Sequence, residues 1–407
     1  MPTTNLMPIS NFSAQLAELA QADQLRHRRI VESINETSMV VDGQRVLQFA
    51  SNDYLGLAQH PRVVEATMRA LKKHGLGAGA SHMVTGHHRL HEELEERLAK
   101  FVCLPKALLF GSGYAANLGI LTSLAGKGDV IFADKLNHAC LNDGAVLSRA
   151  AFKRYAHNNI DKLRAQLDDW RINGSNTARI LIVTDAVFSM DGDIARVPEL
   201  LALAEEYDAL LVLDDAHGFG VLGYRGRGVL EHFNMLNKTS ERIVYMATLG
   251  KAAGGYGAFV AGNADVIDWI MQAARTYLFS TATPPALAAG ALAALDIMQE
   301  DHERRRHLRS MIDFFSDSLK LQFATLPFSQ TAIQPIIVGS NANALAFQAA
   351  LSERHFLVPA IRPPTVPQGT SRLRVSLTAN HIADDVFDLI TAITDIEVSL
   401  MGKNPST

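Results

Sequence analysis

The sequence has little cysteine and little net charge. Its 407 residues include two cysteines, Cys103 and Cys140, and two thiols cannot form the disulfide framework of a small secreted protein. We therefore expect each cysteine to be a small buried hydrophobe in a reducing compartment. The formal net charge of −4 provides no basic field for nucleic acid and no polybasic patch for a membrane surface. These absences favour chemistry on small molecules.

Long apolar runs are also missing. The longest, residues 284–298, contains Gly290 and Asp296 and is too short to cross a bilayer. Residues 1–13 lack the charged and apolar segments of a signal peptide, and no internal repeat or low-complexity tract occurs. We expect a cytoplasmic protein with no nucleic-acid partner and no membrane partner.

The sequence does have a core-forming composition, with 48% hydrophobic residues, and enough length for two lobes. Short apolar segments alternate with helical patterns, which predicts an α/β fold. Its sheet should be mostly parallel, with helices on both faces and ligands at the carboxyl ends of the strands. The expected strands are 107–110, 130–133, 180–185, 210–214, 243–248 and 258–261, and the expected helices are 90–101, 115–124, 160–170 and 197–207.

Two further segments flank this large lobe. Leucines at helical spacing predict an amphipathic helix over 12–31. Pro284 and Pro285 start an alanine-rich helix, after which the pattern indicates a smaller α+β lobe. Its expected elements are helices 301–321 and 342–354 and strands 333–338 and 372–378. We predict an N-terminal segment 1–55, a large domain 56–290 and a small domain 291–407.

Lys251 provides the first chemical signal. It lies in a Thr-Leu-Gly-Lys turn, downstream of a buried strand that ends in Asp214 and is followed by His217. A lysine held in tight backbone near an acid and a histidine is suited to a carbonyl cofactor bound as a Schiff base, and pyridoxal phosphate (PLP) is that cofactor. Asp214 would pair with the pyridinium nitrogen and His217 would reach the phenolic oxygen. A Walker-B-like metal site and a strand-end Asx turn are the alternatives.

A second signal is a possible anion site. The strand 107–110 runs through a Gly-Ser-Gly turn into a helix, which presents free N–H groups at Gly113 and Tyr114 to a phosphate. An ordinary tight turn is the alternative. His138 and Ser189 also follow strands. The ring of His138 could stack on the cofactor and the hydroxyl of Ser189 could bond its ring oxygen, or both could be ordinary loop residues.

Two other patterns are less favoured. A dinucleotide fingerprint, GFGVLG at 218–223, is followed by loop instead of a helix, so a pyrophosphate would have no helix terminus to bind. His82, His87, His88 and His91 form a histidine-rich segment, and the i, i+4 pair His87 and His91 can bind zinc. No third ligand has a defined spacing, and we predict no metal.

The strand 372–378 favours substrate binding by the small lobe. Strict alternation places Leu373, Val375 and Leu377 on one face and Arg372 and Arg374 on the other. Arg374 could then bind a carboxylate with two hydrogen bonds. The alternative is a surface strand with solvated arginines.

Taken together, these motifs resemble the α-oxoamine synthases, PLP enzymes of the aspartate-aminotransferase fold (PLP fold type I). The matching stretches are SNDYLGL at 51–57, GAGAS at 77–81, HEELE at 91–95, DDAHG at 214–218, TLGK at 248–251 and RLR at 372–374. AIRPPTVP at 360–367 and FSMDGD at 188–193 are similar to the biotin-pathway branch, which joins L-alanine to a pimeloyl thioester of coenzyme A or acyl carrier protein. Another small amino acid or acyl donor is the alternative.

The resemblance implies further roles. His138 would also bond the thioester carbonyl, Arg374 the amino-acid carboxylate, and Asn52 would position the substrate. Thr248 would join the phosphate site, and the family forms homodimers. Ser280 or Thr281 would therefore reach the phosphate bound by the partner subunit. Arg26 and Arg362 are the candidates for binding the acyl donor or its carboxylate, and Thr365 is a further candidate for binding substrate. Transamination and a non-enzymatic, cofactor-carrying protein are the competing functions.

Overall fold

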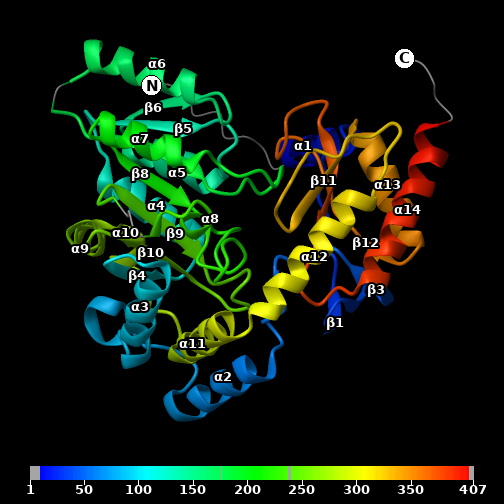
Figure 1. Cartoon of the computed structure of the whole chain (residues 1–407), viewed down its shortest axis with the longest axis horizontal. Helices are drawn as coiled ribbons and strands as arrows, with labels where there is room; N and C mark the ends of the chain where they lie inside the picture. The colour runs from blue at the N-terminus through cyan, green and yellow to red at the C-terminus, as the bar shows by residue number, and fades with distance from the viewer. Residues whose placement is uncertain (1–9, 176, 237–239, 403–407) are drawn as a thin grey trace.

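The computed structural model describes residues 10–175, 177–236 and 240–402. They form two lobes side by side, a large one around a seven-stranded sheet and a smaller one around two short sheets (Figure 1). Helices α11 (Pro285–Glu300) and α12 (His302–Ser318) lead from the large lobe into the small one. Within the described part of the chain, no helix combines the length and apolar character needed to cross a membrane.

The large sheet has the strand order β4-β10-β9-β8-β7-β5-β6. Strand β10 runs antiparallel to both neighbours and all other pairs are parallel, which confirms the predicted mostly parallel sheet. The strands are β4 (Lys106–Phe110), β5 (Val130–Asp134), β6 (Ala151–Tyr155), β7 (Ile180–Asp185), β8 (Leu210–Asp214), β9 (Ile243–Thr248) and β10 (Ala258–Gly262). Strand β6 was not expected.

Both faces of this sheet are covered by helices. Alternation along β4 sends Ala107 and Leu109 into one apolar core and Leu108 and Phe110 into a second core on the opposite face. The second core is closed by α4 (Gly113–Leu124), α5 (Ala139–Ser148), α9 (Ala264–Ala273) and α10 (Arg275–Leu278). The first core is closed by α3 (Arg89–Val102), α6 (Ile160–Asn173), α7 (Val197–Glu206), α8 (Val229–His232) and α11, and α2 (Pro61–His74) packs on α11.

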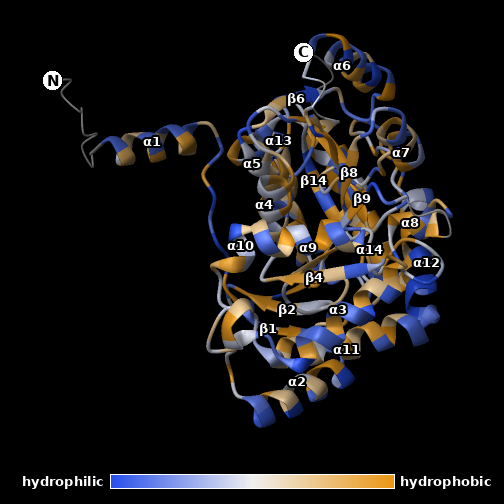
Figure 2. Cartoon of the chain, turned by 90° about the vertical axis from the view of Figure 1, so that its left-hand side faces the viewer, coloured by the Kyte–Doolittle hydropathy of each residue, from blue (hydrophilic) through white to orange (hydrophobic). Residues whose placement is uncertain are grey.

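The N-terminal segment corrects one expectation, since the predicted helix over 12–31 is too long. Helix α1 (Ser10–Gln21) ends where Asp23 adopts a positive φ of 53°. β-branched residues such as Val31 and Ile34 then favour strands, and a small sheet forms. Its members are β1 (Val31–Asn35), β2 (Ser38–Val41), β3 (Gln44–Gln48) and β12 (Phe356–Leu357). Figure 2 shows α1 standing away from the rest of the chain.

The small lobe contains a three-stranded antiparallel sheet of order β11-β14-β13. Its strands are β11 (Ile333–Gly339), β13 (Ala360–Ile361) and β14 (Ser371–Ser376), and its helices are α12, α13 (Asn341–Glu353) and α14 (Ala383–Met401). The predicted helices and strands of this lobe are present within a few residues of their expected ends. Helix α14 was not expected, and a single π-helical turn, η1 (His82–Gly86), precedes α3.

Candidate active site

Three parallel strands end in aspartates at one edge of the large sheet. Asp214 is the last residue of β8 and lies opposite Asp185, the last residue of β7, while β5 ends in Asp134. The loops that follow these strands and β9 surround a cavity of about 210 Å³. The predicted residues that line it are Gly113, Tyr114, His138, Ser189, Asp214, His217, Thr248 and Lys251.

Lys251 is the centre of a short chain of polar contacts. Its Nζ lies 2.8 Å from Nε2 of His217, whose Nδ1 lies 2.6 Å from the hydroxyl of Tyr54. Burial lowers the pKa of the lysine amine, and Asp214 opposes this effect only in part. The pKa of His217 is well below its usual value because of burial and the nearby charges of Lys251 and Arg374. A neutral imidazole therefore faces an amine whose pKa is below the usual value for lysine.

Asp214 is a buried carboxylate that faces the cavity. Its Oδ2 accepts from Nδ2 of Asn117 at 2.7 Å and its Oδ1 accepts from the amide of Ala216 at 3.0 Å. Among the described residues, no lysine, arginine or histidine forms an ion pair with it. A buried negative charge of this kind is suited to a cationic ligand group. The pyridinium N–H of PLP fits that requirement.

The first turn of α4 offers an anion site. Ser112 caps the helix by accepting from the amide of Ala115 at 3.1 Å. The amides of Gly113 and Tyr114 come before any intrahelical acceptor is in reach, so they can donate to a phosphate. Thr248 lies beside them, but its hydroxyl already donates to the carbonyl of Gly257 at 3.0 Å. Its contact with a phosphate would require that hydroxyl to rotate.

His138 lies at the mouth of the cavity as the N-cap of α5. Its Nδ1 accepts from the amide of Cys140, and its own amide donates to Oδ2 of Asp185 at 2.9 Å. These contacts fix the ring while leaving it exposed to a ligand. On the other side of the opening, the carbonyl of Ser189 accepts from Nε of Arg374 at 2.5 Å.

The two arginines of β14 are both buried, which excludes the alternative of solvated surface residues. Arg372 forms a 2.5 Å ion pair with Asp191. Arg374 forms no ion pair with a described carboxylate; it contacts Asn52 Oδ1 at 3.2 Å and the Tyr54 hydroxyl at 3.4 Å. A buried guanidinium without an anionic partner is suited to the carboxylate of a ligand.

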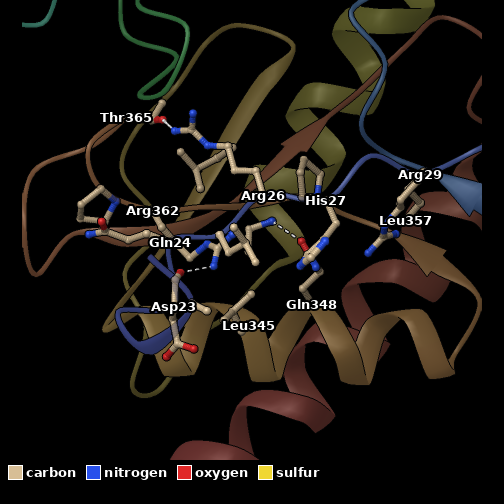
Figure 3. A pocket seen from close by; sticks show the side chains of 16 residues that line it. Asp23, Gln24, Arg26, His27, Arg29, Leu345, Gln348, Leu357, Arg362 and Thr365 are labelled. Atoms are coloured by element: carbon tan, nitrogen blue, oxygen red, sulfur yellow. Dashed lines mark hydrogen bonds between the residues drawn. The ribbon is translucent and has the colours of Figure 1, made fainter. Parts of the chain in front are cut away.

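Three predicted residues lie outside this cavity. Arg26, Arg362 and Thr365 line a separate cavity of about 660 Å³ between the N-terminal segment and the small lobe (Figure 3). Nη2 of Arg26 donates to Oγ1 of Thr365 at 3.1 Å, and Arg362 donates to the carbonyl of Asp23. A third cavity, of about 550 Å³, is lined by Thr365 together with His138 and Ser189, so it borders both of the others.

Ser280 and Thr281 line none of these three cavities. Both side chains are exposed, and Thr281 forms an isolated antiparallel bridge with Ser81. Their contact with a partner subunit stays a prediction. Of the two cysteines, Cys140 is buried as expected, but Cys103 is only half-buried and accepts from Nη1 of Arg227 at 2.9 Å.

The histidine-rich segment brings three rings together, with one ring nitrogen from each of His82, His87 and His91 within 4.8 Å of the others. Nδ1 of His82 lies 2.8 Å from Nδ1 of His87. His91 uses both of its nitrogens elsewhere, because Nδ1 accepts from the amide of His88 at 3.0 Å and Nε2 lies 2.9 Å from the carbonyl of Thr283. The single lone pair of the neutral His91 ring, on Nδ1, is therefore occupied by a hydrogen bond, and His91 could bind a metal only after giving up one of these contacts.

Sequence reasoning missed three residues of the site, namely Asn117, Tyr54 and Asp185. Asn117 lies in an apolar stretch of α4. An amide is unusual in such a place, and this feature could have identified Asn117 as a site residue. Asp185 ends a buried strand just as Asp214 does, so the same reasoning applies to it. Tyr54 had no such signal, because its partners are far away in the sequence.

The comparisons with known proteins agree with this geometry. The family model for aminotransferase class I and II matches residues 44–393. The fold and the lysine-centred site define a PLP-dependent enzyme of the aspartate-aminotransferase fold, and the chain belongs to the class I and II aminotransferase family. Its residues fit the cofactor: Lys251 for its carbonyl, Asp214 for its ring nitrogen and the first turn of α4 for its phosphate.

More specific similarity is to 8-amino-7-oxononanoate synthases. The chain is 53% identical over 386 residues to the one from Methylobacillus flagellatus, which covers 95% of this chain and 96% of that relative. The structure of the Francisella tularensis enzyme of that name has a TM-score of 0.72 at 31% identity, covering 88% of this chain and 99% of that one. A serine palmitoyltransferase from S. paucimobilis with bound PLP and myriocin has a TM-score of 0.89 at 28% identity, covering 97% and 98%.

Proposed function

We propose that the chain catalyses the decarboxylative condensation of L-alanine with a pimeloyl thioester of coenzyme A or acyl carrier protein. The products are 8-amino-7-oxononanoate, carbon dioxide and the free thiol, and the step belongs to biotin biosynthesis. The names of the relatives support this activity. The structural observation that carries it is the 550 Å³ cavity beside His138 and Ser189, because transamination needs no second cavity for an acyl donor.

The residues around Lys251 take defined parts in this reaction. When bound, PLP supplies the electron sink for the negative charge that develops at Cα of alanine. Lys251 would hold the cofactor, and its free amine would remove the Cα proton, since burial lowers the pKa of that amine below its usual value. Asp214 keeps a proton on the ring nitrogen. His217 and Ser189 contact the ring oxygen, and Gly113, Tyr114 and Thr248 hold the phosphate.

Side chains around the three cavities orient the two substrates. Arg374, with Asn52, holds the alanine carboxylate. His138 stacks on the ring and donates a hydrogen bond to the thioester carbonyl as it becomes an oxyanion. Arg26, Arg362 and Thr365 bind the far carboxylate of the pimeloyl chain. In a homodimer, Ser280 or Thr281 contacts the phosphate bound by the partner subunit.

A substrate matrix tests this proposal. Thiol release would be measured for acetyl, heptanoyl, pimeloyl and palmitoyl thioesters, each with alanine, glycine and serine. We expect alanine with the pimeloyl donor to exceed every other pair by at least about 10-fold in kcat/KM, since one methylene in a pocket changes selectivity by roughly 10- to 200-fold. A preference for glycine with an acetyl donor would instead indicate another α-oxoamine synthase.

Changing Arg374 to lysine should weaken alanine binding. Lysine keeps the charge but loses the planar fork that binds a carboxylate with two hydrogen bonds. We expect the KM for alanine to rise by about 30-fold, or ~2 kcal/mol, with the thioester KM changed less than about twofold. Steady-state kinetics with each substrate varied in turn would show this. A larger effect on the thioester KM would reassign Arg374 to the acyl donor.

Changing Arg26 to alanine should reduce selectivity for the far carboxylate. We expect the preference for pimeloyl over heptanoyl thioester to fall by about 10-fold, because only the pimeloyl chain carries a terminal carboxylate. The KM for alanine should be unchanged. The control is Arg28→Ala, since Arg28 does not line the cavity that contains Arg26. An equal loss of activity with the pimeloyl and heptanoyl thioesters would show that Arg26 does not bind that carboxylate.

A further inference from the structure

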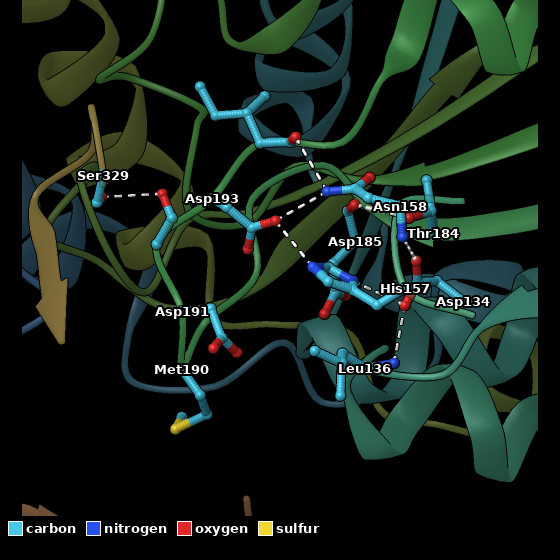
Figure 4. Close-up of polar contacts among 12 residues, drawn as sticks. Asp134, Leu136, His157, Asn158, Thr184, Asp185, Met190, Asp191, Asp193 and Ser329 are labelled. Carbon is cyan, nitrogen blue, oxygen red and sulfur yellow. Dashed lines mark hydrogen bonds and ion pairs between the residues drawn. The ribbon is translucent and has the colours of Figure 1, made fainter. Parts of the chain in front are cut away.

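The loop that carries Ser189, residues 186–194, is fixed from two sides. On the small-lobe side, Nη1 of Arg372 donates to the carbonyl of Met190 at 3.1 Å and pairs with Asp191, while Arg374 donates to the carbonyl of Ser189. On the opposite side, the loop meets residues that follow β6. The central residue there is a histidine that the proposed reaction does not use (Figure 4).

His157 lies between two carboxylates. Its Nδ1 is 3.1 Å from Oδ1 of Asp134, and its Nε2 is 2.8 Å from Oδ2 of Asp193. An ionised carboxylate only accepts hydrogen bonds, so both ring nitrogens must carry protons and the ring is an imidazolium. The edge of the ring also packs on Phe188, with centroids 4.4 Å apart at 89°.

Asn158 reinforces the same connection. Its amide donates to Oδ2 of Asp134 at 2.8 Å, and its Nδ2 donates to Oδ2 of Asp193 at 2.8 Å. Asp134 also accepts from the amide of Leu136 at 2.8 Å, which orders the turn that leads to His138. One cluster therefore contacts both the turn of His138 and the loop of Ser189.

We propose that His157 is a positioning residue: it joins the turn that carries His138 to the loop that carries Ser189, and so sets how these two side chains face each other across the cavity. The consequence for catalysis rests on the proposed function, since that function gives His138 and Ser189 their roles. The mechanical consequence does not, because the hydrogen bonds exist whichever substrate is used.

The charge of His157 should persist through neutral pH. Burial opposes the charge, but the hydrogen bonds and charges of Asp134 and Asp193 outweigh burial and raise the pKa to about 10. Two other groups are nearby: Asp185 on β7 and Tyr155 on β6 both have a raised pKa, mainly through burial. Because the folded pKa exceeds the unfolded value of 6.5, the stabilisation is complete below pH 6.5 and is lost as the pH rises through about 10.

Hydrogen exchange of the PLP-loaded His157→Gln variant tests the proposal. Glutamine cannot donate to both carboxylates with a positive charge, so amides in 134–140 and 186–194 should exchange about 10-fold faster, with α2 unchanged. The kcat should fall by about 10-fold, with the alanine KM within about twofold. Adding Asp193→Asn should cause little further change, because its charged partner is already absent and the amide oxygen of asparagine can still accept from Nδ2 of Asn158. The matched control is His307→Gln, which removes another half-buried histidine, in the small lobe.

The outcomes separate the possibilities. Unchanged exchange in 186–194, or faster exchange in every segment alike, would overturn the positioning role. If His157→Gln does not fold, Asp193→Asn removes the negative charge from the same contact at a partly exposed side chain, and the same segment decides the result. If wild-type protein releases no thiol from a pimeloyl donor while the exchange changes occur as expected, the proposed function fails and the positioning role stands.

Discussion

Replacing Lys251 with alanine is expected to lower thiol release by at least about 10⁴-fold, because the variant loses both the covalent anchor and the base that removes the Cα proton. Burial lowers the pKa of the Lys251 amine, which favours its role as a base. The 2.8 Å contact with His217 fixes the position of the amine. Wild-type protein treated with borohydride should retain PLP at Lys251, and the variant should retain none. Intact-protein mass spectrometry and steady-state kinetics would measure the two effects.

The matched control for Lys251 is Lys162→Ala, since Lys162 is an exposed residue of α6. It should keep normal turnover and normal covalent attachment of PLP. A Lys251→Ala variant that still turns over and still carries reduced PLP would show that another lysine has the role, and the assignment of the whole cavity would then be wrong.

Changing Asp214 to asparagine is expected to slow removal of the alanine α-proton by about 10³-fold, or ~4 kcal/mol. An amide is neutral and cannot hold a proton on the ring nitrogen as a buried carboxylate does. Exchange of the α-proton in D₂O, followed by NMR with alanine and no thioester, isolates this step. The hydrogen bonds from Asn117 and Ala216 place the side chain independently of the acyl donor, so the thioester is not needed.

The neighbouring residue provides the control for Asp214. Asp215 is also buried, but its Oδ2 accepts from the Tyr245 hydroxyl and the Val229 amide, both at 2.7 Å, and it lines no part of the cavity. Asp215→Asn should lower the Tm and leave α-proton exchange within about threefold of wild type. If α-proton exchange slows equally in the two variants, Asp214 affects the exchange only by stabilising the fold.

The sequence predicted the large sheet well for a physical reason. Strands β7, β8 and β9 are buried on both faces, so they appear as continuous apolar runs with clear ends. Strand β1 is exposed throughout and β3 is exposed at its first two residues, so neither forms such a run, and both were missed. The end of α1 was also misjudged, because the leucine spacing continues past the residue at which the backbone leaves the helix.

The site was predictable where it is built from the ends of neighbouring strands. It was unpredictable where it depends on side-chain contacts between residues that are far apart in the sequence. Parallel strands bring their carboxyl ends to one edge, so Asp214, Lys251 and His138 were expected together. The contact between Tyr54 and His217 joins residues 163 positions apart, and no local pattern encodes it. The separate cavity of Arg26 likewise depends on how the N-terminal segment lies on the small lobe.

The stoichiometry of one turnover tests the central claim most directly. The protein would be incubated with PLP, L-alanine labelled with ¹³C at its carboxyl carbon and pimeloyl thioester, and the thiol, labelled carbon dioxide and amino ketone would be counted. The proposed reaction predicts equal amounts of all three, with no pyruvate. Pyruvate formed without thiol or labelled carbon dioxide would show a transaminase and contradict the proposal.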